Sequence, residues 1–298
     1  MAFSQSVVIM LVVVMLAASL MTLHGDAGAP SSEVWFVGRN VADVRGEPAD
    51  DAERVTQAHI GTEVVVIAGS GDWVKVRIPA QGDYLGWMRR ADLVPASKAA
   101  AFASSKQLAL VRVARATVLR DEGRSGREVA AVTMGARLAV IRRQGDLVQV
   151  ALPAGESGYI AENAVVLCDR DNGPPRRGVG DIIKTAEQLL GTPYLWGGMS
   201  ADGIDCSGFV YTVFYVNGVI LPRDAHDQYA VGTPVDRAGL LPGDLVFYST
   251  YAKGASHVGV YTGGQKVIQS GSATGGVAVI GLDDPHYGPK YIGARRVL

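Results

Sequence analysis

Apolar and polar positions follow three different patterns along the chain. Residues 7–21 form one continuous apolar run, residues 32–167 contain short segments that alternate apolar and polar positions, and residues 179–298 begin with helical periodicity. Alternation with a period of two is typical of strands that bury one face, and the 37 glycines suit tight turns between such strands. The pattern therefore predicts a β-rich first half followed by a separate mixed domain.

The β-rich half contains an internal repeat. Residues 61–76 match residues 135–150 at an offset of 74, and residues 86–94 match residues 158–166 at an offset of 72. The two-residue difference falls in a loop between the matching segments. The chain therefore holds two copies of one module, each of roughly 60 residues and built from short strands and turns.

Each copy has the order strand, Gly-Asp turn, strand and Gly-aromatic ending. This order resembles the bacterial SH3-like domains of cell-wall enzymes, which implies small β-barrels at residues 32–95 and 106–167. A generic barrel without a binding role is the alternative. The first copy has Trp73 after its turn whereas the second has Leu147, which favours a spacing role for the second copy.

The third part, residues 179–298, follows a polar stretch at residues 168–178 whose prolines predict a stiff linker. We expect an amphipathic helix with an apolar face from Ile182 to Leu190, and a second helix that is apolar nearly all round and hence buried. The predicted helices are residues 181–190, 206–216 and 224–231, and the predicted strands are residues 245–248, 257–261, 266–269 and 277–280. Helices followed by an antiparallel sheet indicate an α+β fold.

Composition and the N-terminus narrow the function classes. The 28 Lys and Arg residues balance 29 Asp and Glu, so no strong field points to nucleic acid. The apolar run at residues 7–21 is shorter than the roughly 20 residues of a spanning helix and precedes a small-residue site at 27–29. We expect a signal peptide at residues 1–29 and a secreted or cell-envelope protein. Because residues 1–6 lack Lys and Arg, an uncleaved N-terminal anchor stays open.

A cysteine begins the predicted buried helix. Asp205 can cap this helix, which leaves Cys206 in the first turn, where unpaired backbone donors and the helix dipole lower a thiol's pKa. Gly208 leaves one side of that turn open to another element. The other cysteine, Cys168, is interpreted as a small buried residue, because a disulfide would remove a catalytic thiol.

A histidine in a predicted strand could serve this thiol as a base. If residues 262–264 form a three-residue hairpin loop, Tyr261 pairs with Gln265 and His257 lies opposite Gln269 on the same face. The amide could then accept from one imidazole nitrogen and leave the other facing the thiol. An ordinary strand histidine beside an ordinary polar residue is the alternative, and a bulge at the glycines would shift this register.

Five motifs in the third part follow one another in a fixed order. They are GTPYLWGG at residues 191–198, DCSGFV at 205–210, LPRD at 221–224, PGDLVF at 242–247 and HVGVY at 257–261. In this order they resemble the NlpC-type cysteine peptidases, and the two preceding modules resemble the family's γ-D-glutamyl-diamino acid endopeptidases of murein peptides. The resemblance implies a circularly permuted papain-like fold and a hydrolysis that needs no cofactor.

The resemblance also implies residue roles. Cys206 matches the nucleophile, His257 the general base, and Gln269 the third polar residue, where the family commonly has His. A glutamine can orient an imidazole but carries no charge, so it stabilises imidazolium less than an anion does. The hydroxyl of Tyr194 is implied to lie near the nucleophile, where it could polarise the scissile carbonyl.

The remaining implied positions line the substrate groove: Asp205, Ser207, Arg223 and Asp224, with Tyr84 and Trp87 of the first module closing the pocket. Donors such as Ser207 or Arg223 suit the α-carboxylate of D-glutamate, and Asp224 suits a free L-Ala amine. A surface ion pair between Arg223 and Asp224 is the alternative. His226, with two aspartates on a short helix, makes a poor zinc set, and we expect no metal.

The expected function is therefore a thiol endopeptidase that cuts the γ-D-glutamyl-diamino acid bond of peptidoglycan stem peptides and prefers a free N-terminal L-Ala. Two alternatives stay open: a cell-wall-binding protein with a degenerate catalytic domain, and a thiol acyltransferase. Lysine and diaminopimelate are both open as the diamino acid, and the oligomeric state is not predicted.

Overall fold

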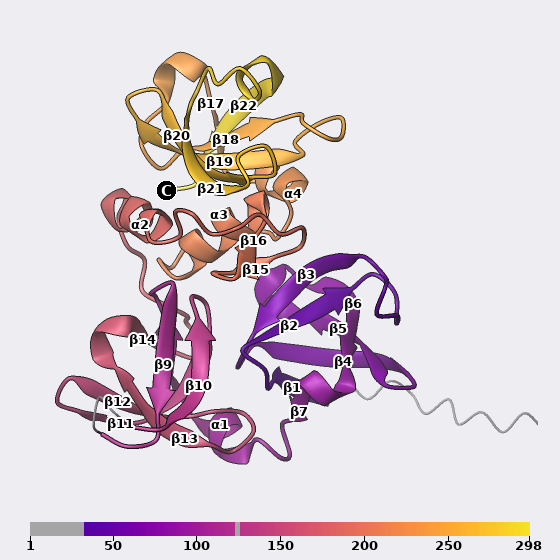
Figure 1. The fold of residues 1–298 in the computed structure, drawn as a ribbon, viewed down its shortest axis with the longest axis vertical. Helices are drawn as coiled ribbons and strands as arrows, with labels where there is room; N and C mark the ends of the chain where they lie inside the picture. The colour runs from indigo at the N-terminus through magenta and orange to yellow at the C-terminus, as the bar shows by residue number, and fades with distance from the viewer. Residues whose placement is uncertain (1–32, 123–125) are drawn as a thin grey trace, which may run out of the picture.

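The computed structural model describes residues 33–122 and 126–298, which form two β-barrels and a mixed α+β unit (Figure 1). The expected signal peptide at residues 1–29 lies outside the described residues. Within the described ranges, no helix is long and apolar enough to cross a membrane.

The first barrel is one antiparallel sheet with the strand order β3-β2-β6-β5-β4-β1-β7. Its strands are β1 (Glu33–Val37), β2 (Val41–Arg45), β3 (Arg54–His59), β4 (Glu63–Ser70), β5 (Trp73–Ile78), β6 (Tyr84–Arg89) and β7 (Leu93–Pro95). In β5, Val74, Val76 and Ile78 are buried in the barrel core, while the intervening Lys75 and Arg77 are half-buried. This alternation confirms the period of two expected for the segment.

The second barrel repeats this topology. A short helix α1 (Ala100–Ser104) leads into the order β10-β9-β13-β12-β11-β8-β14, which equals that of the first barrel with each strand number raised by seven. The strands are β8 (Gln107–Val111), β9 (Arg115–Leu119), β10 (Glu128–Thr133), β11 (Arg137–Gln144), β12 (Leu147–Ala151), β13 (Ser157–Ala161) and β14 (Val165–Asp169). The sequence repeat is thus a repeat of strand order as well.

The third unit contains three helices and a six-stranded antiparallel sheet in the order β17-β22-β18-β19-β20-β21. The elements are α2 (Val179–Glu187), α3 (Cys206–Tyr215), α4 (Ala225–Tyr229), β15 (Met199–Ser200), β16 (Gly203–Ile204), β17 (Thr233–Val235), β18 (Leu245–Tyr248), β19 (His257–Gly263), β20 (Lys266–Gly271), β21 (Gly276–Gly281) and β22 (Tyr291–Arg296). All predicted helices and strands are present. The first helix ends before Leu190, which is therefore exposed instead of facing the core.

Helix α3 is the centre of this unit. Residues 206–214 are all buried, and Phe209 and Phe214 pack with Val258 and Ile268 of the sheet, as the all-round apolar pattern predicts. A side chain at Gly208 would collide with the carbonyl oxygen of residue 198. This glycine therefore lets the preceding loop approach the first turn of the helix, which confirms the expected open side.

The β19–β20 hairpin has a different register from the one expected. Gly259, rather than His257, pairs with Gln269. The turn consists of Gly264 and Gln265, with φ values of 58° and 59°, and a bulge precedes it. Two positive φ values define the two-residue turn whose twist fits the flanking strands. The expected pairing is wrong by two residues, which leaves His257 and Gln269 on the same face.

The first barrel is hydrogen-bonded to the third unit close to the start of α3. Gln57 Oε1 accepts from the Met199 N–H at 3.0 Å, and Nε2 of His59 lies 2.7 Å from the Met199 carbonyl oxygen. The Tyr211 hydroxyl of α3 donates to the Ala80 carbonyl at 2.6 Å. These bonds hold strand β3 and the turn at Ala80 of the first barrel against β15 and α3 (Figure 1).

Candidate active site

Cys206 lies in a cleft of about 330 Å³ formed by the first barrel and the third unit. The first barrel contributes Glu53, Val55 and Tyr84 to its walls. The third unit contributes Tyr194, Trp196, Gly197, Asp205, Cys206, Ser207, Arg223, Asp224, Ala225, His226, Tyr251, Ala252, Lys253, Ala255 and Ser256. The cleft thus unites segments that are far apart in the sequence.

The Cys206 thiol is neutral at pH 7 in this structure. Burial raises its pKa to about 12, and the Asp205 carboxylate acts in the same direction. Hydrogen bonds from the backbone N–H groups of Val258 and Ser207 act against this increase but are outweighed. The lowered thiol pKa expected from the helix N-terminus is therefore wrong for this buried position. Desolvation destabilises the thiolate by more than hydrogen bonds from backbone amides stabilise it. Cys206 and Cys168 are both free thiols.

His257 is the first residue of β19. The next residue, Val258, donates its backbone N–H to the Cys206 thiol. Burial lowers the pKa of His257 to about 4, so the imidazole is neutral at pH 7 and can accept a proton. Its ring stacks on Tyr287, with 4.8 Å between ring centroids and 23° between planes. The hydrogen bond from the Val258 N–H to the thiol places the backbone of His257 close to Cys206, and both side chains are neutral at pH 7.

Gln269 is fully buried behind the imidazole. A hydrogen bond with its side chain raises the pKa of His257, against the larger effect of burial. Nevertheless, Gln269 Oε1 and His257 Nε2 both lack a partner of normal hydrogen-bond geometry among the described residues. The contact between the two side chains is therefore looser than an ordinary hydrogen bond, as catalytic contacts often are without substrate.

Asp205 and Arg223 form a buried network under the cleft. Asp205 caps α3 by accepting from the Gly208 N–H at 2.6 Å, and it accepts from Arg223 Nη2 at 2.6 Å. The other arms of Arg223 donate to Ser207 Oγ at 2.8 Å and to Thr56 Oγ1 of the first barrel at 2.8 Å. The alternative of a surface ion pair is wrong, because Arg223 is buried and its Asp224 contact is longer, at 3.8 Å.

Tyr84 and Trp87 differ in their relation to the cleft. Tyr84 lines it, and a hydrogen bond from its hydroxyl lowers the pKa of Asp224 against the larger, opposite effect of burial. Trp87 is absent from the described cleft walls. Residues three apart on a strand point to opposite faces, so β6 directs Trp87 away, and its expected place in the pocket is wrong.

Several cleft residues were missed by the sequence reasoning. Glu53 accepts from Trp196 Nε1 at 2.7 Å and adds a carboxylate from the loop before β3. Tyr251 packs edge-to-face on Trp196, with ring centroids 5.1 Å apart. Tyr194, unlike Glu53 and Tyr251, was expected from the sequence; burial raises its pKa, so its hydroxyl keeps its proton near Cys206. No local sequence signal marks Glu53 or Tyr251, because only the docking of the barrel and the β18–β19 loop brings them here.

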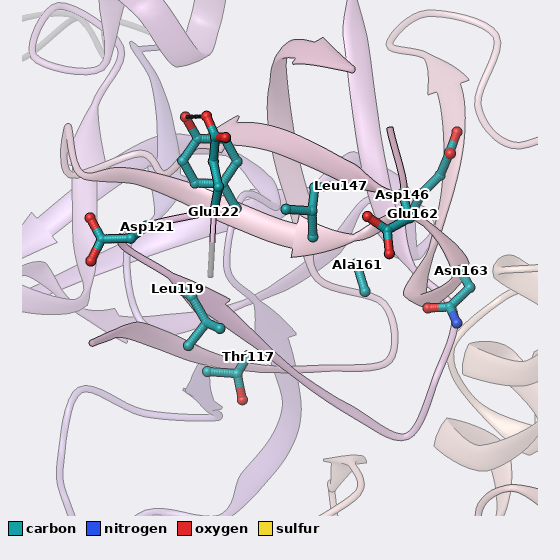
Figure 2. A pocket seen from close by; sticks show the side chains of 10 residues that line it. Thr117, Leu119, Asp121, Glu122, Asp146, Leu147, Ala161, Glu162 and Asn163 are labelled. Carbon is teal, nitrogen blue, oxygen red and sulfur yellow. Dashed lines mark hydrogen bonds between the residues drawn. The ribbon is translucent and has the colours of Figure 1, made fainter. Parts of the chain in front are cut away.

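A larger hollow of about 620 Å³ lies on the second barrel, away from the thiol (Figure 2). Leu147 and Ala161 line it where the first barrel has Trp73 and Arg89, whose guanidinium stacks 4.3 Å from the indole centroid. The described walls of this hollow contain no cysteine, whereas the smaller cleft contains the Cys206 thiol.

Comparisons with known proteins agree with this arrangement. Residues 191–296 match the NlpC/P60 family, and residues 44–93 match the bacterial dipeptidyl-peptidase Sh3 domain. The chain is 34% identical over 252 residues to a gamma-D-glutamyl-L-lysine dipeptidyl-peptidase of Bacillus cereus (strain ATCC 10987 / NRS 248), covering 82% of this chain and 75% of that protein. A protein of the same name from Bacillus subtilis (strain 168) is 32% identical, with 81% and 80% covered.

A solved structure extends the similarity to the whole described fold. The crystal structure of an NlpC/P60 family protein from Bacillus cereus ATCC 10987 superposes with a TM-score of 0.80 at 28% identity, covering 89% of this chain and 99% of that chain. The chain belongs to the NlpC/P60 family of cysteine peptidases. The expected family, the α+β fold and the SH3-like region are confirmed, and the circular permutation stays a prediction.

Proposed function

We propose that this chain is a thiol endopeptidase that hydrolyses the bond between γ-D-glutamate and a diamino acid, lysine or diaminopimelate, in peptidoglycan stem peptides. The observation that carries the proposal is the cleft, which is lined both by Cys206, the first residue of α3, and by residues of the first barrel. Relatives that align with most of this chain are named for the γ-D-glutamyl-L-lysine bond, which supports the same bond here. The enzyme would act in the cell envelope or outside the cell.

The proposed reaction begins with a neutral pair. His257 takes the proton of Cys206, and the sulfur attacks the γ-glutamyl carbonyl carbon. The oxyanion accepts from the Cys206 N–H, which has no earlier partner within its helix, and from the protonated Tyr194 hydroxyl. His257 then protonates the leaving amine, the C–N bond breaks, and water attacks the thioester with His257 as its base.

The proposed substrate orientation follows from charge. A free L-Ala ammonium needs an anion, and Glu53 and Asp224 line the cleft beside the Tyr84 hydroxyl. Ser207 remains the candidate donor for the α-carboxylate of D-glutamate, in exchange for its long bond of 3.4 Å to Asp205 Oδ1. Arg223 would add positive charge rather than direct bonds, since its arms donate to protein groups. An acetylated N-terminus would lose its charge and meet the barrel wall, so we expect a free amine to be preferred.

Mass spectrometry of two peptides tests this function. Wild type and the matched control Cys168→Ala are expected to release L-Ala-D-Glu from L-Ala-γ-D-Glu-L-Lys, whereas Cys206→Ala releases none. N-acetylation of the peptide is expected to lower kcat/KM, and equal rates for both peptides would contradict the amine preference.

Other outcomes distinguish the alternatives. If the wild type cleaves neither peptide, while wild type and Cys206→Ala both pellet with murein, the wall-binding protein with a degenerate catalytic domain is favoured. Addition of a primary amine that diverts the dipeptide into an amide product would favour the acyltransferase. Diaminopimelate in place of lysine, at matched concentration, then identifies the preferred diamino acid.

A further inference from the structure

A threonine in the turn after β20 has no part in the reaction proposed above. The Thr274 hydroxyl oxygen lies 2.7 Å from the carbonyl oxygen of Gly276 and 3.0 Å from that of Gly271. Its third neighbour is Gln269 Nε2, at 3.2 Å. A hydroxyl has a single proton, which can go to these carbonyl oxygens or to the Tyr287 hydroxyl, a further hydrogen-bond partner of this side chain. Thr274 therefore presents a lone pair to Gln269 and acts as the acceptor in that contact.

This contact determines which way the Gln269 amide points. With its NH₂ group on Thr274, the amide places Oε1 on its other side. That oxygen is buried and without a partner of normal geometry in the described residues, and the same holds for Nε2 of His257. The Gln269 side chain raises the pKa of His257 against the larger effect of burial, so the loose contact between the two residues joins a donor to an acceptor.

A glutamine in the third position of the catalytic triad needs such an external constraint more than a carboxylate does. The two oxygens of a carboxylate are equivalent, so either can accept from an imidazole N–H. An amide is asymmetric, and its flipped orientation would set NH₂ against the imidazole N–H, donor against donor. In a buried site, that arrangement leaves unsatisfied groups at substantial cost.

Gly271 leaves space for the two side chains that adjoin the imidazole. A side chain on Gly271 would lie 2.6 Å from Gln269 Oε1 and would collide with the Tyr287 hydroxyl. Tyr287 in turn stacks on the His257 ring. Glycine at this position therefore lets both the amide and the tyrosine approach the imidazole.

We propose that Thr274 is a positioning residue, which turns the Gln269 carbonyl oxygen toward His257 and thereby selects the imidazole tautomer protonated on Nε2. The Nδ1 lone pair is then free to take the proton from the Cys206 sulfur, and the resulting imidazolium keeps its Nε2–H bond to Oε1. The effect of Thr274 on turnover rests on the proposed function, whereas its effect on the His257 tautomer does not.

A double-mutant cycle tests the proposal with peptide cleavage as readout. Thr274→Val removes the hydroxyl at constant shape, Thr274→Ser keeps it, and Gln269→Ala removes the amide. We expect Thr274→Val to lower kcat by on the order of 10- to 100-fold with little change in KM, as for other outer partners of reactive groups. Thr274→Ser should remain near wild type. In the Gln269→Ala background, Thr274→Val should have no further effect.

The same loss in both backgrounds would overturn the proposal, because damage to the turn alone acts independently of Gln269. An unchanged kcat in Thr274→Val would overturn it as well. If the valine variant does not fold, Thr274→Ala takes its place in the cycle.

A measurement without substrate separates this inference from the proposed function. Nitrogen NMR of the imidazole should show the Nε2–H tautomer of His257 in wild type and in Thr274→Ser, and a mixture of tautomers in Thr274→Val. An unchanged tautomer in the valine variant would overturn the positioning role. A wild type that shows the expected tautomers but cleaves no peptide would contradict the proposed function alone.

Discussion

At the scale of single residues, burial decides the protonation of the reactive pair. It raises the pKa of Cys206 and lowers that of His257, so both groups are neutral at pH 7. An isolated helix start would favour a thiolate, yet the first turn of α3 is closed off from water. The proposed enzyme therefore transfers the thiol proton when the substrate is bound, instead of resting as an ion pair.

The pH dependence of kcat/KM should reveal this neutral pair. Because the pKa of His257 is about 4, the neutral base is present above that pH and lost below it. We expect kcat/KM to rise through about pH 4 and to stay level from pH 6 to 8, and iodoacetamide to alkylate Cys206 slowly at pH 7. An acid limb near the ordinary histidine pKa of about 6.5, with fast alkylation at pH 6, would contradict this.

At the scale of elements, one buried arginine connects three parts of the fold. Arg223 binds the capping residue of α3, the first turn of that helix, and Thr56 of β3. Its burial in a salt bridge with Asp205 means that neither charge has water to replace its partner. Arg223, which was expected to touch substrate, lines the cleft but donates its hydrogen bonds to protein groups.

Removal of the Arg223 charge should destabilise the protein more than removal of both charges. Arg223→Met leaves Asp205 buried without its cation, and we expect a loss of about 3–5 kcal/mol in the free energy of unfolding. The double variant Asp205→Asn/Arg223→Met keeps a good helix cap and should recover most of this loss. Chemical denaturation of both variants measures the difference, and equal stabilities would contradict the buried-pair account.

At the scale of the whole molecule, a buried histidine lies where both barrels meet the third unit. His59 of β3 contacts the Met199 carbonyl, and a side chain on Gly135 of the second barrel would lie 2.7 Å from its ring. Burial lowers the pKa of His59 to about 4; the Met199 bond acts against this, and the nearby Arg137 adds to it. Protonation of this ring would place a second cation in a dry interface.

Acid should therefore weaken this junction. Between about pH 6.5 and pH 4 the unfolded chain binds a proton at His59 that the folded chain does not, so stability falls as the pH falls through this window. A shift of this size corresponds to a loss of about 3 kcal/mol. His59→Gln keeps a donor for Met199 but cannot titrate, so its unfolding midpoint in urea should depend less on pH. Identical pH dependences would contradict this role.

The sequence by itself determined the features that depend on neighbouring residues. Alternation in β5, the all-round apolar pattern of α3 and its cap Asp205 are local, and each appears in the structure as expected. The repeat of the two barrels and the motif order also follow from sequence alone, because homologous segments keep their strand order. Cys206 and His257 could be chosen as candidates on this basis.

Only the tertiary structure decided the features that depend on distant segments. A bulge and a two-residue turn set the hairpin register, so Gln269 lies diagonal to His257. Docking of the first barrel placed Glu53 and Tyr84 in the walls of the cleft that contains the thiol. The physical reason is that burial and charge at a site depend on every segment packed around it, whereas capping and periodicity depend on the chain nearby.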